Sequence, residues 1–396
     1  MQFMRFGIAT FAFYPVTWLA MLLGGWGLAL APLVIFSTHL ILDNAFRPDH
    51  DSYRRMQPWL SDAYLYLHIP CGALTYILLM WQAAPDDMLG VGVQLSALLG
   101  HWVLVSHHAY TFGQLIACAA ISGLMMSTNT IVAHELVHRR SNPWALTIGR
   151  ILLGLNGDAQ FAISHVYGHH MQVATPKDPA TARRGESVYR FALRSTVGQY
   201  REAAALERQR LVRLGKTFWN WQNHFLQSIV MTAFFVVISF LLAGTTGLFA
   251  WLVSALVTKF LLEVVNYIQH YGLVRVAGER VEPRHSWDCD SKGATWVFYG
   301  LSRHSNHHNK PALIYTELMP IDAATGSPRL DVGYIACMFM ATMPPVWHRW
   351  ATPRLLEWDK RLASTEERRL ANLANRQSRC SPLVAASTTT LYTDLQ

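Results

Sequence analysis

Long apolar stretches alternate along the chain with shorter polar ones, on the scale expected for helices that cross a membrane. One span needs about 20 mostly apolar residues. Residues 7–42 contain no Asp, Glu, Lys or Arg and are too long for a single span. The pair Gly24-Gly25 near their middle predicts two helices joined by a tight turn.

Further apolar stretches follow, and together they predict an all-α polytopic membrane protein. Lys259 and Glu263 interrupt the last stretch, but they are four residues apart and can pair on one helix face. Residues 88–105 are marginal in length, so an interfacial, a re-entrant and a spanning helix all remain open. The predicted spans number about six and lie near residues 7–23, 25–42, 60–82, 111–133, 226–243 and 247–265.

The predicted hairpin at 226–265 constrains the topology, because two consecutive spans bring the chain back to its starting side. The sequences flanking the hairpin must therefore share one face of the membrane. Residues 139–223, which precede it, hold 13 Lys and Arg against 5 Asp and Glu. By the positive-inside rule this face is expected to be cytoplasmic.

The domain organisation is expected to be simple, with residues 1–370 forming a single integral-membrane domain. Within it, the apolar N-terminus lacks a small-residue cleavage site and is expected to be a retained first span. Residues 354–379 are rich in charge and predict a soluble helix, and residues 371–396 are expected to form a flexible tail.

Composition supports the membrane prediction and excludes several other classes of protein. Charged residues make up 15% of the chain, against roughly 25% in ordinary soluble domains. The net charge of +8 lies in loops between apolar runs, which favours a membrane surface over nucleic acid as the partner. The five cysteines are scattered without a C-x-x-C pair, so a disulfide framework, a zinc ribbon and a fused rubredoxin-type iron site are not expected.

Histidine is the most informative residue type, because half of the 18 histidines lie in four clusters that flank the predicted hairpin. Two histidines four apart on a helix share a face and can bind one metal. A zinc ion takes three or four protein ligands, so nine imidazoles indicate two metals. The candidate catalytic and metal-binding residues are His134, His138, His165, His169, His170, His270, His304, His307 and His308.

The chemistry of these clusters leaves several interpretations open. Imidazole ligands without thiolate suit iron, zinc or copper, and a two-metal membrane site favours iron for oxygen chemistry. The segment His134-Glu135-x-x-His138 alone also matches the zinc metalloprotease motif. A metal transporter would need ionisable residues along its spans. His285 is either a further ligand or a partner of one.

The remaining histidines and the apolar spans carry weaker expectations. The eight other histidines are expected in loops or at membrane interfaces; they are His39, His50, His68, His101, His107, His108, His224 and His348. A substrate channel between the spans could be lined by Phe36, Trp81, Met125 and Met126, although helix packing explains these four side chains equally well.

The four clusters, in this order and with a hairpin before the third, resemble the integral-membrane di-iron hydroxylases of the alkane 1-monooxygenase and xylene monooxygenase family, within the fatty acid desaturase-like superfamily. The similarity covers roughly residues 130–358. Residues 175–181 (TPKDPAT) and 185–187 (GES) resemble the alkane branch. Residues 269–275 (QHYGLVR) and 358–361 (WDKR) are more similar to the branch that oxidises methyl groups on aromatic rings.

The resemblance implies an oxidoreductase of the monooxygenase type (EC 1.14) in the bacterial inner membrane, with a histidine-rich catalytic cap on its cytoplasmic side. The nine histidines would hold two irons that use O2 to convert a terminal methyl group of an n-alkane or alkyl-aromatic into a primary alcohol. Electrons would come from a rubredoxin or a ferredoxin-type protein with its reductase. A desaturase or fatty-acyl hydroxylase of the same superfamily remains the alternative.

The chain also departs from the alkane branch at two positions. Where that branch usually has glutamate, this chain has Ser164 before the second cluster and Gln269 before His270. Neither side chain could bridge metals as a carboxylate, so the metals would be held almost wholly by histidine. The substrate preference of the alkane enzymes therefore does not carry over directly.

Overall fold

Helices are the regular secondary structure of the chain where the computed structural model describes it, at residues 2–320 and 326–393. In these two ranges the only β-type pairing is an isolated bridge between Asp288 and Arg329, and there is no extended strand. The all-α prediction is therefore confirmed.

Long apolar helices form the body of the molecule, as the sequence pattern predicts for a membrane protein. Within the described ranges, 5 helices are long and apolar enough to cross a membrane. Three of them are single elements: α2 (Gly25–Ala45), α7 (Phe112–His138) and α12 (His224–His270). The fourth, Met4–Leu23, ends in α1 (Tyr14–Leu23). The fifth, Pro58–Ala83, contains α3 (Pro58–Tyr66) and α4 (His68–Ala83).

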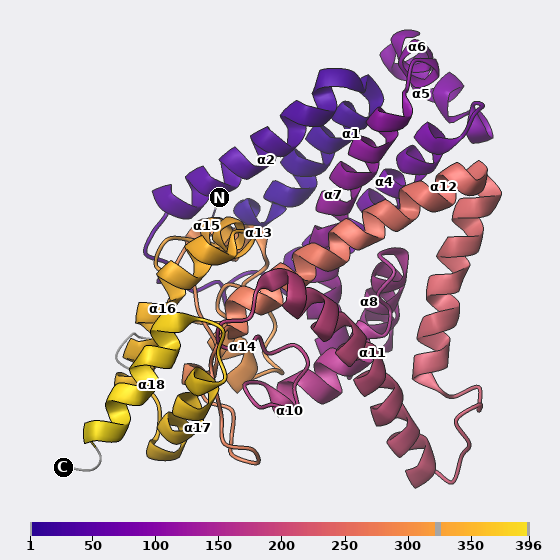
Figure 1. Cartoon of the computed structure of the whole chain (residues 1–396). Coiled ribbons are helices and arrows are strands. Elements are labelled where there is room, and N and C mark those ends of the chain that lie inside the picture. Colours follow the sequence, from indigo (N-terminus) through magenta and orange to yellow (C-terminus); the bar gives the residue numbers. More distant parts are fainter. Residues whose placement is uncertain (1, 321–325, 394–396) are drawn as a thin grey trace.

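The 47-residue element α12 is the predicted hairpin, because its backbone breaks in the middle. Ala243 leaves the helical region at φ −141° and Gly244 follows at φ 61°, a left-handed value that glycine adopts without a steric penalty. Figure 1 shows the two arms of α12 meeting at a sharp bend. When these two arms are counted separately, the number of long apolar helices equals the six predicted spans. The predicted turn between α1 and α2 is also present, with Gly24 at φ 62°.

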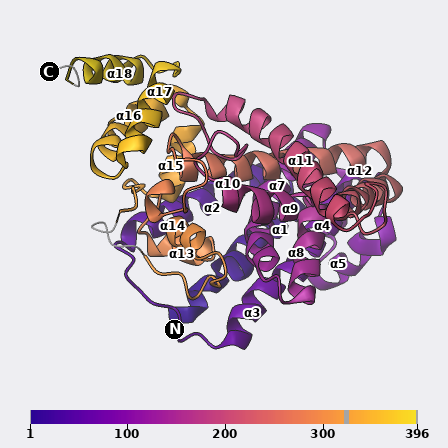
Figure 2. The ribbon, with the colours of Figure 1, turned by 90° about the horizontal axis from the view of Figure 1, so that it is seen from below.

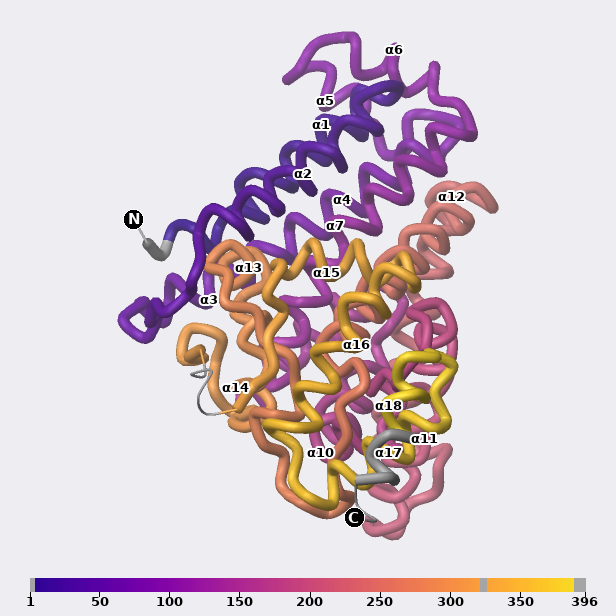
Figure 3. Tube along the Cα trace, turned by 60° about the vertical axis from the view of Figure 1, so that its left-hand side comes forward, coloured from indigo at the N-terminus to yellow at the C-terminus, as the bar shows by residue number. Residues whose placement is uncertain are grey.

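Residues 88–105 do not form one long helix. They fold into η3 (Met88–Gly90), α5 (Val91–Leu99) and the start of α6 (Trp102–His108). Gly100 at φ 105° separates α5 from α6, and helices of 9 and 7 residues are too short to cross a bilayer. In Figure 3 these two helices lie at the end of the molecule opposite α10 (His170–Gln172) and α14 (His304–Asn309).

Helix α7 lies at the centre of the bundle and packs closely on α12. A Cβ atom at Gly123 would lie 2.5 Å from the carbonyl oxygen of Ser254, so only glycine permits this approach. Thr258 uses the proximity and donates a hydrogen bond of 2.9 Å to the carbonyl of Gly123. The predicted Lys259–Glu263 pair is present on the same arm, with Nζ and Oε1 2.8 Å apart.

The histidine clusters gather at one end of this bundle, together with shorter helices. Around them lie α8 (Pro143–Leu155), α9 (Phe161–Ile163), α11 (Val188–Arg213), η5 (Pro283–His285), α13 (Lys292–Val297) and α15 (Tyr334–Ala341). The C-terminal helices stand at one side of this end in Figure 2; they are α16 (Pro344–Arg361), α17 (Thr365–Arg376) and α18 (Ser381–Thr393).

The single helix predicted for residues 354–379 is wrong, because the chain forms two helices there. The hydroxyl of Ser364 caps α17 through the backbone of Glu367, and the Glu367 carboxylate caps the backbone of Ser364 in return. Arg184 ties these helices to the histidine end through Asp359, at 2.6 Å, and Asn375, at 2.9 Å. The domain boundary at residue 370 falls inside α17, and the flexible tail stays a prediction.

Candidate metal centre

The first cluster lies on the last turn of α7, where the predicted four-residue spacing places both imidazoles on one face. The ring centroids of His134 and His138 are 4.9 Å apart. Glu135 points elsewhere, because its carboxylate accepts hydrogen bonds of 3.1 Å from Arg139. Arg139 also contacts Asp62 at 2.6 Å, so Glu135 belongs to an ion-paired group and is not placed as the base of a zinc protease.

The second cluster adopts a conformation that the sequence did not predict. Residues Ser164–His169 form a π-helix, η4, in which hydrogen bonds join residues five apart. This winding places His165 and His170 together, with their Nε2 atoms 3.1 Å apart. His169, one residue earlier, faces a different set of imidazoles.

The third and fourth clusters meet in the same region. His270 ends α12, and its Nε2 lies 2.9 Å from Nε2 of His304 at the start of α14. One turn later, Nε2 of His308 lies 3.1 Å from the same atom. His307 points to the other side of α14, where its Nε2 is 3.2 Å from that of His170.

All nine predicted residues therefore come together, and they divide into two groups. In each group the nitrogens that could bind a metal lie within 4.8 Å of one another. Group A consists of His134, His138, His165, His170 and His307, and group B consists of His169, His270, His304 and His308.

The geometry of both groups fits bound metal ions. Imidazole nitrogens about 2.1 Å from a shared ion are about 3 Å apart, close to the spacings above. Within the described part of the chain, Nε2 of His134, His138 and His169 has no hydrogen-bond partner although it is buried. Burial and then the neighbouring imidazoles lower the pKa of His165 and His307 well below the usual value, so both rings are neutral and can coordinate a cation.

A carboxylate orients one of the nine rings from outside the groups. Asp178 Oδ2 accepts a hydrogen bond of 2.9 Å from Nδ1 of His169, which leaves Nε2 turned toward group B. The same carboxylate accepts bonds from the hydroxyl of Thr181, at 2.6 Å, and the backbone of Ala180, at 2.9 Å. Such carboxylate–histidine pairs are typical of metal sites, because they fix the tautomer of the ligand.

Two of the open questions from the sequence are resolved by hydrogen bonding. His285 belongs to neither group: its Nε2 lies 2.7 Å from the Glu367 carboxylate. Ser164 donates to Gln160 at 3.1 Å, and Gln269 donates to the carbonyl of Leu301 at 3.1 Å. Ser164 and Gln269 therefore have structural partners and lie outside both histidine groups.

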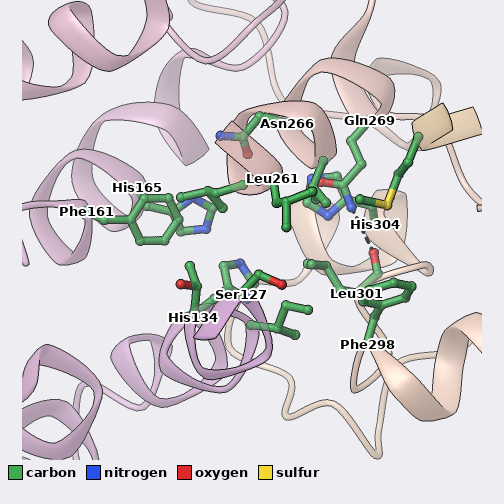
Figure 4. A pocket seen from close by; sticks show the side chains of 15 residues that line it. Ser127, His134, Phe161, His165, Leu261, Asn266, Gln269, Phe298, Leu301 and His304 are labelled. Carbon is green, nitrogen blue, oxygen red and sulfur yellow. Dashed lines mark hydrogen bonds between the residues drawn. The ribbon is translucent and has the colours of Figure 1, made fainter. Parts of the chain in front are cut away.

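One small pocket adjoins both groups and has a cavity volume of about 40 Å³. His134 and His165 of group A and His304 of group B form part of its wall, as Figure 4 shows. Its apolar lining comes from α7, α12 and the segments beside them, namely Ile131, Phe161, Leu261, Leu262, Val265, Phe298, Leu301 and Met338. An apolar group that enters this space would lie directly against the imidazoles.

The four channel candidates do not line this pocket, and packing, the alternative that the sequence left open, accounts for them. Met125 and Met126 are buried in the helix bundle, and Phe36 packs edge-on against Phe339. Trp81 donates a hydrogen bond of 2.9 Å to Asp87. The pocket is lined by residues of α7 other than Met125 and Met126, and the sequence pattern alone did not show which side of this helix faces a pocket.

The sequence also misjudged several other histidines and missed two polar residues. His39, His68 and His107 are buried within helices and do not lie in loops. Asn266, on the pocket wall, and Glu202, packed against the π-helix at Gly168, were not singled out. Asn266 lies four residues before His270 and so one turn away on the same face, a spacing that could have indicated it.

Comparison with known proteins agrees with this geometry. A sequence model of the fatty acid desaturase family matches residues 111–337. The alkane 1-monooxygenase of Ectopseudomonas oleovorans is 30% identical over 349 residues, which cover 84% of this chain and 80% of that protein. The xylene/toluene monooxygenase hydroxylase component XylM of Pseudomonas putida is 30% identical over 346 residues, or 87% of each chain.

Proposed function

The chain belongs to the fatty acid desaturase family and, within it, to the alkane and xylene monooxygenases, and from this membership we propose that it hydroxylates a terminal methyl group of a hydrophobic substrate to a primary alcohol. The family identifies it as a membrane-bound oxidoreductase of the monooxygenase type. The proposal concerns the substrate, the metals, the electron donor and the orientation in the membrane.

The observation that carries the proposal is the position of the apolar pocket. It is bounded by His134 and His165 from group A and by His304 from group B, so it opens on both groups at once. A hydrocarbon has no polar group for directional binding, and burial against apolar side chains is what holds it. The same side chains keep water away from the reacting carbon.

The nine histidines are proposed to hold two irons, one in each group. When bound, the irons would supply the activation of O2 that inserts one oxygen atom into a C–H bond. The chain contributes orientation: the winding of η4 aims His165 and His170 at group A, and Asp178 holds the ring of His169 toward group B.

The electrons are proposed to come from a rubredoxin or a ferredoxin-type protein with its reductase. Tyr167 and Met171, on the segment that carries the second cluster, are 47% and 67% exposed. The Arg140 guanidinium lies 5.2 Å from the centroid of the Tyr167 ring. A positive surface next to the metal ligands would attract an acidic carrier.

The proposed membrane orientation rests on the basic segment at residues 139–223. We propose that the protein lies in the bacterial inner membrane with both histidine groups on the cytoplasmic side. The excess of Lys and Arg in residues 139–223 supports this orientation, because that segment leads into the hairpin and contains the second cluster. Residues 1–370 are proposed to act as one domain.

The test is to purify the full-length protein, count its metal and assay it with a generic ferredoxin and reductase. Octane, xylene and a fatty acid are offered together, and the products are identified by mass spectrometry. Two irons per chain and a primary alcohol from octane or xylene support the proposal. One zinc per chain, or a double bond introduced into the fatty acid, would refute it.

A further inference from the structure

Apart from the histidines, Asn266 is the polar side chain in the pocket whose hydrogen bonding is incomplete. It is 5% exposed, and its Nδ2 atom has no partner anywhere in the described residues. Figure 4 shows it on the side of the pocket opposite Ser127 and His134. A buried amide without a partner costs free energy, so its presence among apolar side chains indicates a ligand that completes its bonding.

The other hydroxyl and amide side chains of the pocket already have partners. The Ser127 hydroxyl donates to the carbonyl of Leu124 at 2.6 Å. Thr130 accepts a bond of 2.8 Å from Asn156. Gln269 donates from its Nε2 to the Tyr334 hydroxyl at 2.8 Å as well as to a backbone carbonyl. Asn266 therefore stands apart as the group prepared for a polar atom of the ligand.

The chemistry of a primary amide specifies which polar group fits. Its nitrogen donates and its oxygen accepts, and a hydroxyl group can do both. A hydroxyl therefore satisfies Asn266 in either orientation of the amide. A saturated hydrocarbon satisfies neither atom, so the pocket distinguishes an oxygenated ligand from an alkane of the same length.

We propose that Asn266 binds the hydroxyl group of the primary alcohol, so that the pocket holds the product of hydroxylation more tightly than the hydrocarbon. This inference rests on the proposed function, because that function places an alcohol in the pocket. Asn266 thereby sets the relative affinity for substrate and product. It also favours substrates that carry a hydroxyl or another hydrogen-bonding oxygen over pure hydrocarbons.

The experiment compares the binding of 1-octanol and octane to the full-length protein in lipid nanodiscs. Calorimetric titrations into nanodiscs without protein are subtracted to remove partitioning into lipid. The variant Asn266→Leu keeps the size of the side chain and removes the amide, and Asn266→Ala removes it without adding bulk. Ser127→Ala, which removes a pocket hydroxyl that already has a partner, is the matched control.

In the wild type and in Ser127→Ala, 1-octanol is expected to bind more tightly than octane. In both Asn266 variants the ratio of the two affinities should fall about fivefold to tenfold, the effect of one hydrogen bond. Circular dichroism and gel filtration establish that each variant is folded. If one Asn266 variant does not fold, the other gives the result.

An unchanged affinity ratio in a folded Asn266 variant would overturn the proposal, as would a loss of the preference in Ser127→Ala. Failure to bind either ligand in the wild type would overturn it as well. Turnover of octane is measured separately on the same preparation. Failure of the proposed function then appears as the absence of alcohol product, whereas failure of the Asn266 proposal appears in the affinities.

Discussion

Two regions of this molecule contain buried histidines, and they differ in how the ring nitrogens are satisfied. In the helix bundle, His68 uses both nitrogens: Nδ1 lies 3.2 Å from Asn129 Oδ1, and Nε2 lies 2.9 Å from the Tyr299 hydroxyl. In the two histidine groups, Nε2 of His134 and His138 lacks any partner among the described residues.

The difference separates a structural histidine from a proposed metal ligand. Around His68, the Tyr14 hydroxyl also bonds to Asn129 at 2.6 Å, so the polar atoms satisfy one another. Such a network is complete without a further molecule. The histidine groups keep buried ring nitrogens without a protein partner among the described residues, as is expected where the lone pairs of the rings would bind a cation.

The largest effect should come from removing one ligand. His308→Ala is expected to lower product formation at least about a hundredfold and to reduce bound iron, because the proposed coordination at group B becomes incomplete. Iron analysis and a product assay on the membrane fraction measure both changes. His348→Ala is the control, since His348 lies outside both groups. Full activity in His308→Ala would refute the ligand assignment.

A smaller effect is expected from the residue that orients a ligand. Asp178→Ala removes the acceptor for His169 Nδ1 and should weaken metal binding about 10- to 100-fold, while the nine imidazoles remain. Competition with a chelator at equilibrium measures this affinity. The exposed carboxylate of Asp331, which pairs with Arg354 at a distance from the groups, supplies the control variant Asp331→Ala. Equal affinities in both variants would show that Asp178 does not position the ring.

For the structural histidine His68, a substitution is expected to lower stability and to leave the bound metal unchanged. His68→Ala removes two partners from the network and should lower stability by roughly 2–3 kcal/mol, because buried polar atoms lose their bonds and a cavity forms. The iron content of the folded protein should stay unchanged. Thermal unfolding in detergent and metal analysis measure the two quantities. Loss of iron without loss of stability would contradict the structural role of His68.

The smallest effect concerns Glu202, which lies close to the second cluster but in neither group. Burial, and next the charge of Asp178, raise the pKa of Glu202 to about 8. The folded state therefore keeps a proton that the unfolded state loses above its ordinary pKa of about 4.3, and stability falls as pH rises between these values.

Glu202→Gln should remove this decline, by an amount on the order of 1 kcal/mol after screening by solvent. Unfolding of the metal-free protein between pH 5 and about pH 8 measures it. Parallel stability curves for the variant and the wild type would show that Glu202 does not hold a proton in the folded state.

Much of the fold could be predicted from the sequence, because membrane spans and metal ligands both leave local patterns. The lengths of the apolar stretches gave the spans, and Gly244 shows the kind of residue that joins two of them. Eight of the nine histidines stood out because their spacings of three to five residues place them on shared helix faces, whereas His270 stood alone at the exit of the predicted hairpin.

What could not be predicted depends on contacts between distant segments. The spacing of His165, His169 and His170 does not reveal that a π-helix sends them to different groups. Nor does it show that Asp178 turns back to His169. The buried location of His68 follows from Asn129 and Tyr299, which lie 61 and 231 residues away.

The division of the second cluster has one more consequence. Six residues of backbone connect a ring in group B with two rings in group A, and α14 makes a similar link between His307 and His308. A displacement of either segment must disturb both groups together. The two groups are thereby coupled through shared backbone, and a substitution that moves one of these segments is expected to alter both groups.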